Sequence, residues 1–148
     1  MIAIFTMAGA QFLLRWVHFL SGVTWIGLLY YFNFVQGEWF KEADAASKSA
    51  AIQKLVPRAL AWFRYAALFT FITGVLVLGM EGHMAGMGVY STAWGVLILT
   101  GGSLGILMFL NVWLIIWPNQ KVIIASAKAV AAGGQAHPDV AACGAKAA

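Results

Sequence analysis

The chain has 148 residues, of which 62% are hydrophobic and 9% are charged, and its mean hydropathy is +0.84. Soluble domains carry about 25% charged residues, so this composition excludes an ordinary water-facing surface. The formal charge of +4 comes from nine basic residues scattered between apolar runs, a pattern that argues against nucleic acid as a partner. The single cysteine, Cys143, excludes an intramolecular disulfide and a c-type haem attachment motif.

Three apolar runs are long enough to form transmembrane helices. A hydrocarbon layer of about 30 Å takes about 20 helical residues to cross. We expect these spans over residues 11–35, 60–80 and 93–117. The predicted fold class is therefore all-α, an integral membrane helical bundle that forms a single membrane domain over residues 1–148.

The polar segments beside these spans set the expected orientation. We expect a loop over residues 36–59, with an amphipathic surface helix within it as an alternative. We also expect a tail over residues 118–148 that begins with a helix over residues 120–132, which Gly133 and Gly134 end. Cytoplasmic flanks of membrane proteins accumulate Lys and Arg, and basic residues gather in or beside these two segments: Lys41, Lys48, Lys54, Arg58, Arg64, Lys121, Lys128 and Lys146. Both segments are thus expected on the cytoplasmic side, with the N-terminus in the periplasm. The alanine-rich end leaves room for a fourth span beyond Ala148.

The first span carries an imidazole and a guanidinium on one helical stripe. Residues at spacings of three and four share a helix face, and this stripe comprises Arg15, His18, Gly22, Trp25 and Leu29. An ionisable group within hydrocarbon is costly, so His18 is a candidate functional residue. In one interpretation His18 ligates the iron of haem b, Gly22 leaves space for the macrocycle and Arg15 pairs with a propionate. In the other, Arg15 reaches the membrane surface and His18 only bonds a neighbouring helix.

His83 offers a second imidazole toward the same membrane face. It follows the second span in a glycine-rich connection, and His18 lies about two turns inside the corresponding end of the first span. The two could share a metal, although a loop histidine of this kind is more often solvated. Three nearby methionines add copper as an alternative to haem iron, namely Met80, Met84 and Met87.

The third span favours contact with another membrane helix. Small residues at four-residue spacing let helix backbones approach closely, and this span contains Gly101, Gly102, Ser103 and Gly105. Three helices bury little of one another's surface, so we expect a homo- or hetero-oligomer. The sequence contains no nucleotide-binding loop or nucleophile elbow, and its acidic residues are expected in loops, which leaves enzymatic activity an open question.

Three stretches resemble the membrane domain of the bacterial membrane-bound urate oxidase family. The first, RWVHFLSGVTWIGLLYYFNF, is similar to the first helix of that family, with matches at Arg15, Trp16, His18, Gly22, Trp25 and Gly27. FTFITGVLVLG resembles its second helix, and NVWLIIWPNQKVI resembles its third helix and exit. The resemblance implies a bacterial inner, or intracytoplasmic, membrane. It also implies a C-terminal cytochrome c, electron transfer towards the respiratory chain and a further helix bearing another histidine.

These observations support three functional hypotheses. The first is a membrane redox subunit that binds haem b through His18 and relays electrons within a larger oxidoreductase complex. The second is a non-catalytic accessory subunit of a respiratory or copper monooxygenase complex. The third is urate oxidation with a separately encoded cytochrome c, because this sequence has no haem c motif. The expected partners in all three are the lipid bilayer and other membrane subunits.

Overall fold

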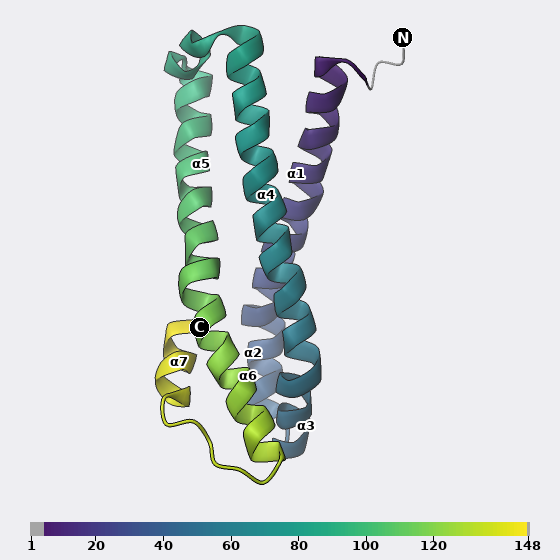
Figure 1. Ribbon diagram of the computed structural model, residues 1–148, viewed down its shortest axis with the longest axis vertical. Coiled ribbons are helices and arrows are strands. Elements are labelled where there is room, and N and C mark those ends of the chain that lie inside the picture. The colour runs from purple at the N-terminus through teal and green to yellow at the C-terminus, as the bar shows by residue number, and fades with distance from the viewer. Residues whose placement is uncertain (1–4, 148) are drawn as a thin grey trace. The chain divides into compact units, whose positions relative to one another are not determined.

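The computed structural model describes residues 5–147 and is helical over most of them (Figure 1). Three helices are long and apolar enough to cross a membrane, and they cover Met7–Glu42, Ala45–Ala85 and Ala93–Ala131. No strand occurs within residues 5–147. The predicted all-α membrane fold with three spans is confirmed, whereas the fourth span suggested beyond Ala148 lies outside the described residues.

Each long helix is a succession of α-helical and π-helical segments. In chain order the elements are α1 (Met7–Tyr30), η2 (Tyr31–Gln36), α2 (Gly37–Glu42), α3 (Ala45–Ala50), η3 (Ala51–Leu55), α4 (Val56–Ala85), η4 (Met87–Ser91), α5 (Ala93–Asn111), η5 (Val112–Ile116), α6 (Trp117–Ala131) and α7 (Val140–Ala147). The segments η2, η3 and η5 are π-helical, and η4 is a 3₁₀ turn.

The helices extend beyond the predicted spans. They have 36, 41 and 39 residues, against the roughly 20 that the hydrocarbon requires. The apolar pattern marks only the part suited to lipid, whereas helix formation continues through polar residues that pair along one face. Lys41 and Glu38, three residues apart, form such an ion pair at 2.7 Å.

Residues 36–59 are helical except at one break, which contradicts the expected loop and agrees with the alternative of a helix within this segment. The chain is extended at Ala43 and Asp44, and the Asp44 side chain accepts hydrogen bonds from the backbone N–H groups of Ala46 and Ser47. This N-cap satisfies donors that the first turn of a helix leaves free, so α3 begins immediately after the break. The polar composition therefore marks exposed helix surface rather than irregular chain.

The described residues form two compact units. The first contains residues 5–24 and 65–109, and the second contains residues 25–64 and 110–147.

In the first unit, a tight connection joins α4 to α5. Gly86 ends α4 with a left-handed φ of +83°, which glycine adopts without steric cost. A Cβ at Gly95 would lie 2.4 Å from the carbonyl oxygen of Val89, so only glycine fits there. The Tyr90 hydroxyl donates a hydrogen bond to the carbonyl of Leu78, which ties the connection back to α4.

In the second unit, aromatic contacts hold the helices together. Phe63 is 2% exposed and meets Phe32 edge to face, with ring centroids 5.6 Å apart. The Arg64 guanidinium lies 3.3 Å from the centroid of the Trp117 ring, a cation–π contact. The short helix α7 packs on α6.

Candidate functional site

His18 is half-buried on α1, and its Nδ1 bonds to α4. Nδ1 lies 2.9 Å from the carbonyl oxygen of Thr70 and 3.3 Å from Oγ1 of Thr73. A carbonyl oxygen can only accept, so Nδ1 carries the proton and Nε2 of the neutral ring keeps its lone pair. Within the described chain, Nε2 makes no hydrogen bond. The site therefore presents one oriented imidazole whose Nε2 lone pair is available to a metal ion.

Glycine allows this ring to approach α4. A Cβ at Gly74 would lie 3.0 Å from Cε1 of His18 and 3.3 Å from Nδ1. A second polar contact lies one turn further along α1, where the Thr70 hydroxyl donates to Ser21 Oγ at 3.0 Å. A Cβ at Gly22 would lie 3.9 Å from Cγ2 of Thr70. Thr70 thus occupies space beside Gly22 that the sequence had suggested for a macrocycle.

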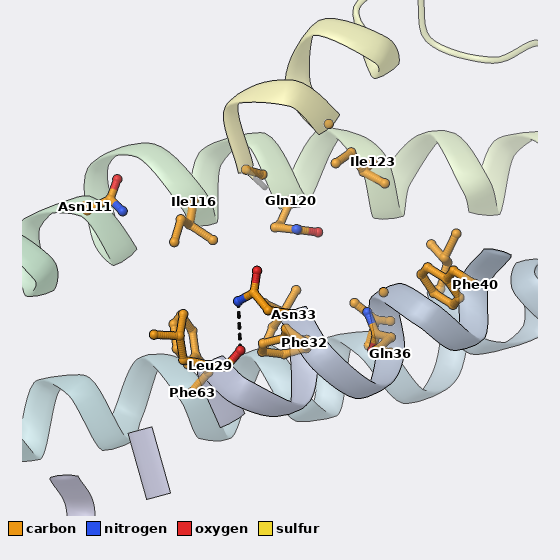
Figure 2. A pocket seen from close by; sticks show the side chains of 16 residues that line it. Leu29, Phe32, Asn33, Gln36, Phe40, Phe63, Asn111, Ile116, Gln120 and Ile123 are labelled. Atoms are coloured by element: carbon orange, nitrogen blue, oxygen red, sulfur yellow. Dashed lines mark hydrogen bonds between the residues drawn. The ribbon is translucent and has the colours of Figure 1, made fainter. Parts of the chain in front are cut away.

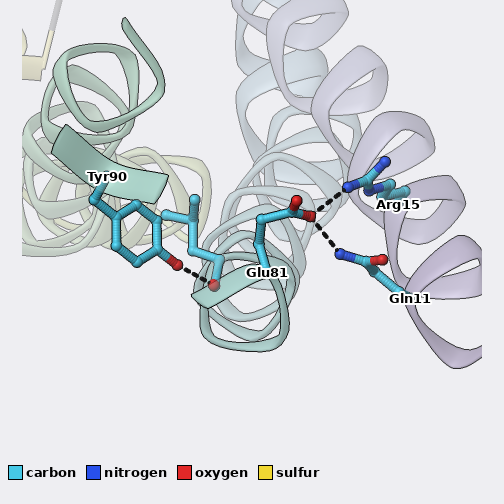
Figure 3. Close-up of polar contacts among 5 residues, drawn as sticks. Gln11, Arg15, Glu81 and Tyr90 are labelled. Atoms are coloured by element: carbon cyan, nitrogen blue, oxygen red, sulfur yellow. Dashed lines mark hydrogen bonds and ion pairs between the residues drawn. The ribbon is translucent and has the colours of Figure 1, made fainter. Parts of the chain in front are cut away.

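Arg15 pairs with a carboxylate of the chain itself (Figure 3). Its Nη2 donates to Oε2 of Glu81 at 2.9 Å, and Nε2 of Gln11 donates to the same oxygen at 2.7 Å. Gln11 is buried, at 8% exposed, whereas the Arg15 side chain is 57% exposed. The predicted propionate partner of Arg15 must therefore use the other N–H groups of the guanidinium.

Glu81 was missed because its position was interpreted as a loop. That interpretation is wrong, since α4 continues to Ala85 and carries both Glu81 and His83. A helical signal was present in the sequence, because Thr70, Gly74 and Glu81 recur at spacings of four and seven. Together with Thr73, these positions supply the contacts of α4 to His18 and Arg15.

His83 is not brought to His18. It is exposed in the last turn of α4, nine residues after Gly74, against which the His18 ring packs. At 1.5 Å per residue, that separation is about 13 Å along the helix axis, too far for two imidazoles to bind one ion. Within residues 5–147, no group of three His, Cys, Asp or Glu residues could hold a metal ion.

The remaining residues of the predicted stripe lie in the second unit. Trp25 is 5% exposed and belongs, with Leu29, to the unit that begins at residue 25. Of the five stripe residues, the structure therefore groups Arg15, His18 and Gly22 in the first unit against α4.

The glycine face of α5 is open within the chain. A Cβ at Gly101, Gly102 or Gly105 would have no neighbouring atom within 4 Å. Leu97 and Leu104 of the same helix are 73% and 59% exposed. This helix therefore retains a smooth apolar surface that lipid or another helix can cover.

No protein-family model, curated protein or solved structure matches the chain. The resemblance to the membrane-bound urate oxidases therefore stays a prediction from the sequence patterns. The arrangement around His18 is the structural observation that bears most directly on the function of this chain.

Proposed function

We propose that the chain is a redox subunit of a larger membrane complex, in which His18 would hold the iron of haem b. The observation that supports this most directly is the hydrogen bond from Nδ1 to the Thr70 carbonyl. Histidine ligands usually donate their second ring N–H to such an oxygen, which fixes the tautomer and the ring orientation. A bound haem would supply one-electron chemistry, and α4 would hold the imidazole in place.

The first unit provides one residue that would hold the haem iron and one that would bind a propionate. Nε2 of His18 is a free donor atom, and Gly74 admits the ring so close to α4 that its orientation is restrained. His83 is too distant to be the second ligand, and we assign that ligand to another subunit of the complex. Arg15 has further N–H groups for a propionate, because the Glu81 contact uses Nη2.

The proposal includes the membrane placement argued from charge. The lysines of residues 36–59 and 118–148 support a cytoplasmic position for those segments, in a bacterial inner or intracytoplasmic membrane. The N-terminus then lies in the periplasm. His18, in the N-terminal half of the long helix Met7–Glu42, would hold its haem toward the periplasmic face.

The decisive experiment is an absorbance spectrum of the chain purified with its membrane complex. We expect a Soret band that disappears in His18→Ala and persists in His83→Ala, which is the matched control because His83 is exposed and remote from the site. A Soret band retained in His18→Ala would refute the ligand assignment. A wild-type complex without any haem would refute the redox role itself.

A second candidate is a non-catalytic accessory subunit, and the open glycine face of α5 favours it. In that case Gly101→Ile should abolish co-purification with partner subunits, whereas Gly79→Ile on α4, also without neighbours within 4 Å, should not. An assembled complex that lacks haem but depends on Gly101 would support this function. Urate turnover by membranes that also contain a cytochrome c would instead support the urate oxidase hypothesis.

A further inference from the structure

The second unit contains a cavity of about 450 Å³ that the haem proposal does not use (Figure 2). A water molecule takes up about 30 Å³ of liquid, so this space is far too large for one bridging water. It falls within the range of about 300–1,000 Å³ that small-molecule sites occupy. Most of its wall is aliphatic or aromatic, and it carries four carboxamide side chains, those of Asn33, Gln36, Asn111 and Gln120.

The three π-helical segments of the described chain all contribute to this wall. Segment η2 provides Phe32, Asn33 and Gln36, η3 provides Ile52, and η5 provides Ile116. A π turn is rare, inserts one residue into an α-helix and frequently occurs at a functional site. Three such turns from three separate stretches of chain surround one cavity, which favours a binding site over a packing defect.

The polar groups of the cavity require a neutral partner that both donates and accepts hydrogen bonds. Oε1 of Gln36 is buried and has no hydrogen-bond partner within residues 5–147, so it lacks a donor. Nδ2 of Asn33 donates to the carbonyl of Leu29 at 2.8 Å, and Figure 2 shows its oxygen directed toward α6. None of the lining residues is ionisable, so a charged ligand would lose hydration without compensation.

The aromatic residues of the cavity and the position of Gln36 in the sequence further restrict the class of ligand that the cavity can bind. Phe32 lies in the wall, packed edge to face on the buried Phe63, and offers ring surface to a flat molecule. Gln36 lies two residues before Glu38, where the apolar sequence of the first helix gives way to charge. A ligand at this boundary would have a polar ring near water and an apolar tail in lipid.

We infer that this cavity binds the headgroup of a membrane quinone or quinol. The carbonyl groups of a quinone accept hydrogen bonds from carboxamide NH₂ groups such as that of Gln36, and the hydroxyl groups of a quinol donate to carboxamide oxygens such as that of Asn33. The ring packs among apolar side chains that include Phe32. This assignment goes beyond the haem proposal and does not depend on it, because every residue involved belongs to the second unit.

Equilibrium binding of decylubiquinone to the full chain in nanodiscs tests the assignment. Gln36→Leu should weaken binding about tenfold, because a quinone carbonyl then loses the hydrogen bond donated by the Gln36 NH₂ group. Gln53→Leu is the matched control, because Gln53 also lies in a π-helical segment but bonds Ser49 and does not line the cavity. Decylbenzene, which has the same tail and no oxygen, should bind at least tenfold more weakly than the quinone.

A second variant tests the assignment independently, in case Gln36→Leu does not fold. Gly144 lines the cavity from α7, and a Cβ there would meet no atom within 4 Å, so Gly144→Phe should fill the space without disturbing a carboxamide. We expect loss of quinone binding with an unchanged circular dichroism spectrum. The inference is overturned if the wild type does not bind the quinone, if decylbenzene binds equally well, or if Gln53→Leu weakens binding as much as Gln36→Leu.

Discussion

Replacing Gly74 by alanine measures how firmly α4 holds the His18 imidazole. The new Cβ would lie 3.0 Å from Cε1 of His18, whereas non-bonded carbons prefer about 3.5–4.0 Å. The ring would therefore withdraw by roughly 0.5 Å. The 2.9 Å bond from Nδ1 to the Thr70 oxygen would lengthen to about 3.4 Å, outside the normal range. Loss of that bond lowers the free energy of unfolding by about 1 kcal/mol.

Gly79→Ala is the matched control on the same helix. A Cβ at Gly79 has no neighbour within 4 Å, so this variant reports only the higher helix propensity of alanine, about 0.5–1 kcal/mol. The same gain applies to Gly74→Ala and cancels in the comparison. We therefore expect Gly74→Ala to be about 1 kcal/mol less stable than Gly79→Ala.

Two measurements test whether Gly74→Ala displaces the His18 imidazole from the Thr70 carbonyl. Unfolding in mixed micelles with increasing SDS gives the stability difference between the variants, and ¹⁵N NMR of the imidazole reports which ring nitrogen carries the proton. The wild type should show a protonated Nδ1, and Gly74→Ala should show a mixture of tautomers. Equal stability of the two variants, with Nδ1 still protonated in Gly74→Ala, would refute the reasoning.

Three further predictions concern the polar contacts of the fold. The Ser47 hydroxyl and then the Ser47 N–H lower the pKa of Asp44 from its ordinary value of 3.8, so the cap stabilises α3 above that pH and is lost as pH falls through the lowered value. In thermal melts followed by circular dichroism, the melting temperature should therefore fall less on acidification below about pH 5 in Asp44→Ala than in the wild type. A double-mutant cycle of Arg15→Gln and Glu81→Gln should give a coupling below about 1 kcal/mol, given the exposure of Arg15, and a coupling several times larger would contradict that. Tyr90→Phe should lower the unfolding free energy by about 1 kcal/mol, and an unchanged SDS midpoint would show that its bond to Leu78 contributes nothing.

Hydropathy predicted the number and type of the long helices because lipid-facing helices must be continuously apolar. It could not predict where they end. Glu38 and Lys41 look like loop residues by composition, yet they form an i,i+3 pair on a helix surface. The break at Ala43 and Asp44 depends on a local capping contact that the average polarity of the segment does not reveal.

The candidate site was predicted only in part. The helical stripe identified His18 and Arg15, and the interpretation that His18 bonds a neighbouring helix is confirmed by its contact with Thr70. That contact leaves Nε2 free, so the haem hypothesis stays a prediction rather than being excluded. The cavity around Gln36 could not be predicted, because a π turn depends on how the helices pack and has no residue pattern of its own.

The length of the helices bears on how deeply the chain sits in a bilayer. Since no long helix stops where its apolar stretch stops, vertical position depends on anchors such as the exposed Trp39 and Trp94 and on the nearby lysines. Matching a thinner or thicker membrane then costs only fractions of a kcal/mol per ångström, since a shift alters which side chains meet the headgroups and leaves backbone bonds intact. Quenching of tryptophan fluorescence by brominated lipids of graded chain length would reveal this, and a fixed depth in every lipid would disprove it.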